Sequence, residues 1–301
     1  MVRPQRKLQQ LGEAAVENLE RQDWLEPLAE SLQRALVATF QAAGETGRRV
    51  RDFLHGTWLG HPLHPVLTDI PLGAWTVAMV LDVKGRHNGH EDRAADAAIA
   101  IGLAGATGAA VTGLTDWQHT SSEDRRLGLV HGVLNISAAT LYATSLALRL
   151  RGARTAGRTI GALGFAVALG AAYLGGNLVY RKRIGVDHAP RVEWDDFATA
   201  LPEAELRESI PRRVDVRGIP VVLIRRAERI HALADSCAHL GGPLSEGQLD
   251  DVSIRCPWHG SRFGLDDGAL PEGPSTFSQP CFDVRIRAGH IELRARRSPA
   301  P

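Results

Sequence analysis

Two short motifs near the C-terminus carry residue types that bind metal ions. The first reads C-A-H from Cys237 to His239, and the second reads C-P-W-H from Cys256 to His259, with sixteen residues between them. Structural zinc sites usually pair like with like, two cysteines and then two histidines. Here each motif mixes one thiolate with one imidazole, which favours an iron–sulfur cluster with two cysteines on one iron and two histidines on the other. A zinc site is the alternative.

The residues around these motifs extend the pattern. The first loop reads C-A-H-L-G-G-P-L and the second reads C-P-W-H-G-S-R-F, and both resemble the cluster-binding loops of the Rieske family of 2Fe–2S proteins. The resemblance covers about residues 209–295 and implies a small all-β domain with a Rieske-type cluster, whose histidines are exposed at its tip. It implies four ligands: Cys237, His239, Cys256 and His259.

Two departures from the high-potential members of that family bear on the reduction potential. Those members carry a further cysteine in each loop and join the two by a disulfide, whereas Gly242 and Trp258 stand at these positions. They also hydrogen-bond the cluster through a serine, matched here by Ser261, and through a tyrosine, replaced here by Phe263. Hydrogen-bond donors stabilise the more negative reduced cluster. The resemblance therefore predicts a low-potential, ferredoxin-like cluster.

Local composition in this region agrees with a β domain. Short β-prone runs alternate with turn residues such as Asp266-Asp267-Gly268 and Ala288-Gly289. The predicted strands are Val214–Val216, Val221–Ile224, Ile230–Ala234, Val252–Arg255, Cys281–Ile286 and His290–Leu293. The third cysteine, Cys281, is expected to be a buried small hydrophobe.

Four long apolar windows lie upstream of this domain. Each has about the 20 residues that a membrane-spanning helix needs, and all are rich in Ala and Gly, which allow helices to pack closely in lipid. The windows are Val66–Val83, Ala94–Leu114, Leu127–Leu148 and Thr159–Tyr180. A soluble helical bundle is the alternative, and no clear internal repeat is seen. The net charge of +1 gives no indication of a nucleic-acid partner.

The first of these windows begins with a distinctive sequence. It reads G-H-P-L-H-P-V-L-T-D-I-P-L-G over Gly60–Gly73 and resembles a family of small bacterial four-helix membrane proteins without an assigned activity. The resemblance covers roughly His55–Tyr180. The expected fold is therefore an all-α four-helix transmembrane bundle followed by an all-β Rieske domain.

We expect four segments along the chain. Residues 1–54 form an amphipathic helical segment, 55–183 the transmembrane domain, 184–208 a linker and 209–296 the Rieske domain. In the first segment apolar residues recur every three or four positions, as in Leu8, Leu11, Val16 and Leu19. This segment is expected to lie on the membrane or on the Rieske domain, and docking to a partner protein is the alternative.

Membrane topology follows from the helix count. Four spans place both ends of the chain on one side, but basic residues flank the two sides almost equally and do not decide the orientation. The start of the chain is polar and basic, without the apolar core of a secretory signal, and no disulfide is expected. We therefore expect a multi-pass protein of the cell inner membrane, in contact with lipid, with its Rieske domain in the cytoplasm.

Polar residues gather at one end of the predicted bundle. His61, His64 and Asp69 start the first span, and His131 and Asn135 start the third. Intramembrane polar residues are costly and indicate a function or a hydrogen-bonding role. In one hypothesis His64 and His131 ligate a b-type haem; in a second they form a quinone or proton-handling pocket, with Asp69 as partner. In the third they cap helices and hydrogen-bond between spans; the opposite half of the bundle is expected to be nearly featureless.

These patterns predict a membrane-tethered protein that transfers one electron at a time to or from an unknown donor and acceptor: a quinone, a haem or a membrane enzyme. One alternative is a ferredoxin-like donor to a separate oxygenase, and another is a redox sensor or scaffold at the membrane. Oxygenation by this chain alone is not expected, because only about forty residues follow His259, too few for a mononuclear iron domain. Whether the protein is an oligomer is left open.

Overall fold

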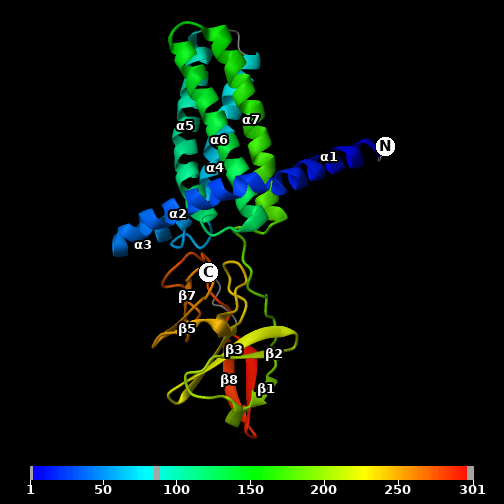
Figure 1. Cartoon of the computed structure of the whole chain (residues 1–301), viewed down its shortest axis with the longest axis vertical. Coiled ribbons are helices and arrows are strands. Elements are labelled where there is room, and N and C mark those ends of the chain that lie inside the picture. The colour runs from blue at the N-terminus through cyan, green and yellow to red at the C-terminus, as the bar shows by residue number, and fades with distance from the viewer. Residues whose placement is uncertain (1–2, 85–88, 297–301) are drawn as a thin grey trace. The chain divides into compact units, whose positions relative to one another are not determined.

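The chain folds into two compact units in the computed structural model, which describes residues 3–84 and 89–296 (Figure 1). The first unit contains residues 1–54 and 63–184, and the second contains residues 55–62 and 185–301. Met1, Val2, residues 85–88 and residues 297–301 are outside the description, as are the side chains of Arg3, Pro4, Gln5 and Leu8. The expected combination of a helical region and a C-terminal β domain is confirmed.

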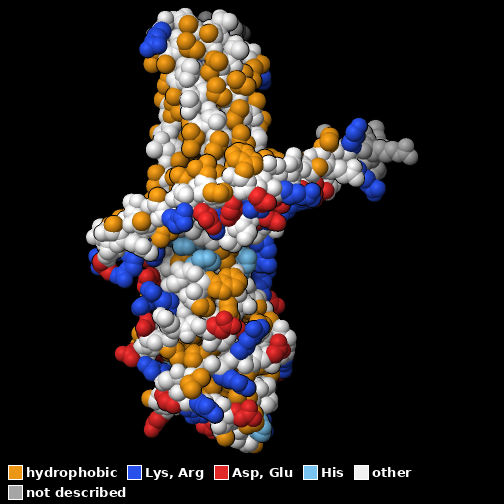
Figure 2. Space-filling model, in the orientation of Figure 1, with side chains coloured by type: hydrophobic (Ala, Val, Ile, Leu, Met, Phe, Trp, Pro, Cys, Tyr) orange, Lys and Arg blue, Asp and Glu red, His pale blue; other side chains and the backbone are white. Residues whose placement is uncertain are grey.

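The first unit is built on four long antiparallel helices (Figure 1). They are α4 (Leu63–Lys84), α5 (Gly89–Trp117), α6 (Ser122–Leu150) and α7 (Arg154–Tyr180). Each contains an 18-residue window with a mean hydropathy of 1.3 to 1.7, and only 17 to 33% of that window is buried inside the protein. Figure 2 shows hydrophobic side chains over the outer faces of these helices. Such outward apolar surface is what a bundle surrounded by lipid exposes.

An internal repeat that is not evident from the sequence alone relates the hairpin of α4 and α5 to the hairpin of α6 and α7. Trp75 on α4 stacks on Tyr142 on α6, with ring centroids 4.2 Å apart and an interplanar angle of 16°. Each ring lies against a glycine of its own hairpin, Trp75 against Gly102 and Tyr142 against Gly164, where a Cβ would be too close. The expectation of no repeat is therefore wrong: equivalent residues meet across a pseudo-two-fold axis.

The sequences of α5 and α7 also show the repeat when equivalent residues are aligned. Residues 102–113 read G-L-A-G-A-T-G-A-A-V-T-G and residues 164–175 read G-F-A-V-A-L-G-A-A-Y-L-G, identical at seven of twelve positions. The small residues that the two halves share lie on α5 and α7, whereas the residues that meet at the axis lie on α4 and α6. Equivalent residues are thus offset by 67 positions on the first helices of each hairpin and by 62 on the second ones.

The end of the bundle away from the predicted histidine site carries a network of charges. Three arginines and three aspartates alternate in a closed ring of ion pairs: Asp82, Arg149, Asp96, Arg154, Asp92 and Arg158. The Arg149 side chain is fully buried and binds both carboxylate oxygens of Asp82. Asp82 and Arg149 are again equivalent positions of the repeat. The expectation that this half is nearly featureless is wrong.

Three shorter helices precede the bundle, and the first two of them pack on its end. These are α1 (Arg3–Glu20), α2 (Glu26–Ala42) and α3 (Gly44–His55), with the short helix η1 (Asp23–Leu25) between the first two. Gln33 donates hydrogen bonds to the carbonyls of Trp117 and Thr120 at 2.7 and 3.1 Å, and Arg126 donates to the carbonyl of Glu20 at 2.7 Å. Apolar side chains remain exposed on the same helices: Leu11, Trp24, Leu28 and Leu32. This part of the chain is helical, and its contact with the membrane or with the Rieske domain stays a prediction.

The second unit contains three antiparallel sheets of three strands each, in the orders β1-β9-β8, β2-β3-β4 and β5-β6-β7. The strands are β1 (Ala198–Pro202), β2 (Arg212–Val216), β3 (Ile219–Arg226), β4 (Arg229–Ala234), β5 (Gln248–Leu249), β6 (Ser253–Arg255), β7 (Arg262–Gly264), β8 (Phe282–Arg287) and β9 (His290–Ala295). All six predicted strands are found. Strand β1 pairs with β9, so the β structure begins upstream of the expected boundary at residue 209.

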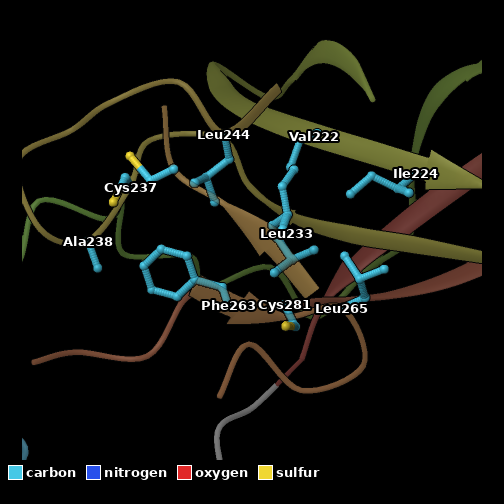
Figure 3. Close-up of a cluster of buried hydrophobic side chains, with 11 residues drawn as sticks. Val222, Ile224, Leu233, Cys237, Ala238, Leu244, Phe263, Leu265 and Cys281 are labelled. Atoms are coloured by element: carbon cyan, nitrogen blue, oxygen red, sulfur yellow. The ribbon is translucent and has the colours of Figure 1, made fainter. Parts of the chain in front are cut away.

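Two hydrophobic cores stabilise this unit. One lies between β1, β2 and the β8–β9 hairpin and contains Phe282 and Ile291. The other, shown in Figure 3, contains Leu233, Phe263 and the three cysteines. Strands β4, β6 and β7 therefore enter the second core directly beside the two metal-binding motifs, and this core holds both loops in place.

Replacing Arg149 by Met should destabilise the bundle by about 3–5 kcal/mol, because the Asp82 carboxylate would remain buried without its main partner. The measurement is thermal unfolding of the detergent-solubilised full chain, followed by helical circular dichroism. The double variant Arg149→Met/Asp82→Leu should recover most of the loss. Arg151→Met, which alters an exposed arginine nearby, should change stability by less than about 0.5 kcal/mol. Equal losses in the Arg149 and Arg151 variants would contradict the importance of the buried pair.

Candidate iron–sulfur centre

The first metal-binding motif forms a tight turn after strand β4. The amide of Cys237 donates to the carbonyl of Gly242 at 2.9 Å, and the amide of Gly241 donates back to the carbonyl of Cys237 at 2.8 Å. Gly241 has a φ of +79°, a conformation that side-chain-bearing residues seldom adopt. The short helix η3 (Leu244–Glu246) follows and closes the loop.

The second motif repeats this turn between β6 and β7. The amide of Cys256 donates to the carbonyl of Ser261 at 2.8 Å, and the amide of Gly260 donates back to Cys256 at 3.1 Å. Gly260 has a φ of +83°. In both loops a cysteine is therefore bonded to the residue five positions later, and a left-handed glycine stands four positions later. The histidine comes two positions after the cysteine in the first loop and three after it in the second.

The two cysteine sulfurs have equivalent surroundings within their turns. Cys237 and Cys256 are 1% and 3% exposed. Each thiol accepts hydrogen bonds from the amides two and three residues later, which belong to His239 and Leu240 in one loop and to Trp258 and His259 in the other. Amide donors stabilise a thiolate. The two turns therefore prepare each sulfur to carry negative charge.

The two thiols also interact with each other and share one proton. The hydrogen bond from Cys237, together with the amides of Trp258 and His259, lowers the pKa of the Cys256 thiol to about 7, against the effect of burial. The same thiol–thiol hydrogen bond, together with burial, raises the pKa of Cys237. Sulfurs close enough to share a proton are placed to bind one iron.

The histidines of the two motifs meet beside the cysteines. The imidazole centroids of His239 and His259 are 5.0 Å apart, with the rings at 86° to each other. Burial lowers the pKa of both imidazoles, and the neighbouring His259 lowers that of His239 further. Both rings are therefore neutral at pH 7, which is the form that binds metal ions. The structure therefore brings the two predicted cysteine ligands to each other and the two predicted histidine ligands to each other.

The space between the loops also fits a bound cluster. A Cβ added at Gly242 would lie 2.9 Å from Cδ2 of Trp258 and 3.0 Å from Sγ of Cys256, so only glycine leaves room beside that sulfur. Within the described residues no three His, Cys, Asp or Glu side chains are arranged to hold one ion. A Rieske cluster does not need such a group, because each of its irons takes only two side chains. The donor set fits this cluster.

Groups around the ligands brace the two loops. The hydroxyl of Ser261 is fully buried and accepts the amide of Ser275 at 2.9 Å, which leaves its own hydrogen available to donate. Gln279 accepts the amide of Ala238 at 3.0 Å and donates to the carbonyls of Ala234 and Ser236 at 2.7 and 2.8 Å. Sequence reasoning missed Ser275 and Gln279, because no spacing rule links this third loop to the motifs. Phe263 is fully buried on β7.

The membrane histidines of the first unit also come together. The ring centroids of His64 and His131 are 6.4 Å apart, at an angle of 89°. Nδ1 of His64 is 2.8 Å from the carbonyl oxygen of Ala109, and Nδ1 of His131 is 2.9 Å from that of Ala171. The side chains of His61 and Asp69, by contrast, are exposed. The structure therefore pairs the two histidines with each other and with backbone carbonyls.

Comparison with known proteins gives matches for both units. Residues 196–283 match the family described as Rieske [2Fe-2S] domain, and residues 60–188 match the family described as predicted membrane protein (DUF2231). Ferredoxin CarAc of Metapseudomonas resinovorans is 32% identical over 95 residues, which cover 31% of this chain and 89% of that protein. The 3-phenylpropionate/cinnamic acid dioxygenase ferredoxin subunit of Escherichia coli (strain K12) is 30% identical over 93 residues, covering 31% of this chain and 87% of that protein.

A third relative is much longer than its matching part. Apoptosis-inducing factor 3 of Mus musculus is 33% identical over 100 residues, which cover 33% of this chain but only 16% of that protein. The two ferredoxins, in contrast, are at least 30% identical and are matched over most of their length. Through the domain that contains the paired Cys-His turns, the chain therefore belongs to the Rieske [2Fe-2S] family, joined here to a predicted membrane protein (DUF2231) domain.

Proposed function

We propose that this multi-pass membrane protein transfers single electrons through a 2Fe–2S cluster bound by Cys237, His239, Cys256 and His259. The observation that carries the proposal is the repeated turn, which presents one buried thiol and one neutral imidazole from each loop. When bound, the cluster supplies a one-electron redox centre. The protein binds it, keeps the two sulfurs away from water, and leaves the imidazole side as the route for the electron.

The proposed cluster has a low reduction potential. The positions at which high-potential relatives carry a disulfide are Gly242 and Trp258, and the buried Phe263 has no hydroxyl to donate to the cluster. Ser261 supplies one donor, since the Ser275 amide occupies only an acceptor position of its hydroxyl. With fewer donors the reduced, more negative state is less stabilised. This supports a potential in the lower part of the Rieske range.

We place the protein in the cell inner membrane with the Rieske domain in the cytoplasm. Four apolar helices place both termini of the bundle's chain on the same side, and none of the three cysteines forms a disulfide, as in a reducing compartment. The exposed apolar residues of α1 and α2 suit contact with lipid at the membrane surface. Attachment to the membrane raises the effective concentration of the cluster near membrane partners, for which a quinone, a haem or a redox enzyme is proposed.

A second candidate function is electron donation to a separate oxygenase. It is favoured by the two relatives of similar domain length, one named Ferredoxin CarAc and the other a dioxygenase ferredoxin subunit. The two functions differ in the acceptor. Reduced protein in liposomes would be re-oxidised by a membrane quinone within seconds under the first, and only after a soluble oxygenase is added under the second. Slow oxidation by every acceptor would indicate a sensor or scaffold.

Replacing Cys256 by Ser should abolish the cluster, because Ser cannot supply the thiolate that iron requires at this position. The measurement is the electron paramagnetic resonance spectrum of the dithionite-reduced full chain, together with its iron content. Cys281→Ser is the matched control, since it removes the third cysteine from the same core and should keep the signal. Loss of the signal in both variants, or in neither, would contradict the ligand assignment.

Replacing Ser261 by Ala should lower the reduction potential by about 40 mV, which is the one-electron equivalent of one hydrogen bond of about 1 kcal/mol. The wild-type potential itself should lie below about +100 mV, toward the lower part of the Rieske range. Both values are measured by redox titration of the visible spectrum. Ser278→Ala, at an exposed serine, should leave the potential unchanged, and a wild-type value well above the limit would refute the low-potential proposal.

The metal-free domain should lose stability as the pH falls below the usual His pKa of 6.5. Burial holds the pKa of His239 and His259 lower in the folded state, so the unfolded chain binds more protons there. The loss is at most about 1.4 kcal/mol per pH unit for each histidine. Thermal unfolding followed by tryptophan fluorescence at pH 7.5 and 5.5 measures it. His259→Ala should reduce the pH dependence, whereas His290→Ala, at an exposed histidine, should not.

A further inference from the structure

The histidine end of the bundle repeats the pseudo-two-fold arrangement seen at its centre. His64 and His131 are equivalent positions, as are Trp75 and Tyr142, and both pairs meet across the axis. The carbonyls that bind the two imidazoles belong to Ala109 and Ala171, which are also equivalent in the 102–113 and 164–175 alignment. The two histidines therefore sit in matching surroundings and face a common axis.

The hydrogen bonds to the carbonyls fix which ring nitrogen carries the proton. A carbonyl oxygen only accepts, so Nδ1 of each imidazole is the donor, and Nε2 of a neutral ring then keeps its lone pair. The amide nitrogen of Asn135 donates to the carbonyl of His131 at 2.9 Å and also lies 3.2 Å from Nε2 and 3.4 Å from Nδ1 of the ring, so an ion bound at Nε2 takes the place of this second, longer contact. An imidazole held through Nδ1–H by a backbone carbonyl, with Nε2 free to coordinate, is the usual arrangement of a histidine metal ligand.

The separation of the rings suits one shared ion. Two imidazoles that bind one ion from opposite sides, through nitrogens at about 2.0 Å, have ring centroids about 6 Å apart, and the observed distance is 6.4 Å. Glycines leave room for both rings: a Cβ at Gly113 would lie 2.7 Å from Cε1 of His64, and one at Gly175 would lie 3.0 Å from Cε1 of His131. A larger residue at either position would displace the ring.

We infer that His64 and His131 bind one transition-metal ion between them, as a bare ion or as the iron of a porphyrin. The site is separate from the cluster-binding loops and rests on the bundle alone. Only two side chains coordinate, so the other positions are filled by porphyrin nitrogens or by water, or stay empty as in a linear ion. Simple hydrogen bonding between helices is the competing explanation, and it predicts no bound metal.

The test uses the full chain purified in detergent, in wild-type form and with both Cys237 and Cys256 replaced by Ser to remove the cluster. Metal-free protein is titrated with haemin and, in separate samples, with Cu²⁺ and Zn²⁺. Binding is measured by absorbance and by elemental analysis. We expect one porphyrin or one ion per chain in the form without Cys237 and Cys256, whose loops no longer supply thiolates that compete for metal, so this result does not depend on the cluster. Haemin binding with low-spin bands identifies the porphyrin, and uptake of a metal ion alone identifies the bare ion.

Variants decide whether the two histidines are the ligands. His64→Ala and His131→Ala should each weaken binding at least tenfold, and His61→Ala, at an exposed histidine of the same end, should not. Gly113→Ala keeps both ligands but displaces the His64 ring and should weaken binding several-fold, whereas Gly170→Ala, which meets nothing within 4 Å, should bind as the wild type. Helical circular dichroism reports folding. Failure to bind any of the three probes, or unchanged binding in folded His131→Ala, would overturn the inference.

Discussion

Backbone amides directed at the two cysteine sulfurs are the interaction on which the cluster-binding loops depend. A sulfur that carries negative charge in a buried position needs donors, and each thiol has the amides of the second and third following residues. The chain can deliver both amides only by turning back sharply, which requires the left-handed Gly241 and Gly260. Strands β4 and β6 lead into the turns, and Gln279 fixes the first of them from a distant part of the chain.

Polar side chains in the membrane bundle also need hydrogen-bonding or charged partners, and the repeat supplies them. Lipid offers no water to a polar side chain, so such groups must pair with one another or with the backbone. Equivalent residues do this at two levels: the His64 and His131 rings adjoin at one end, and Asp82 binds Arg149 at the other. The stack of Trp75 on Tyr142 lies between them. Small residues on α5 and α7 allow the close approach that these contacts require.

The sequence predicts well what is encoded locally and poorly what depends on distant pairs. The Cys-His motifs, the six longer β-prone runs and the four spans are local patterns, and all are present in the structure. Strands β5 (Gln248–Leu249) and β7 (Arg262–Gly264) each contain a single apolar residue, so no β-prone run marks them, and β1 forms only because β9 lies beside it. Gln279 is 41 residues from the Ala238 amide that it binds. The repeat was hard to detect because two of the three pairs that meet at the axis differ in residue type, and because the offset between equivalent residues changes from 67 to 62 within each hairpin.

Each domain of this chain satisfies its own polar groups, so two such different domains can be combined. Electron transfer asks little covalent chemistry of a protein, so function depends on where a redox centre is held and what shields it. The Rieske domain holds its ligands by backbone turns and a small core, independently of lipid. Trp258 is 56% exposed, and its ring centroid lies 6.4 Å from that of His259, so one of the two loops combines a buried sulfur with an exposed aromatic ring three residues or fewer away.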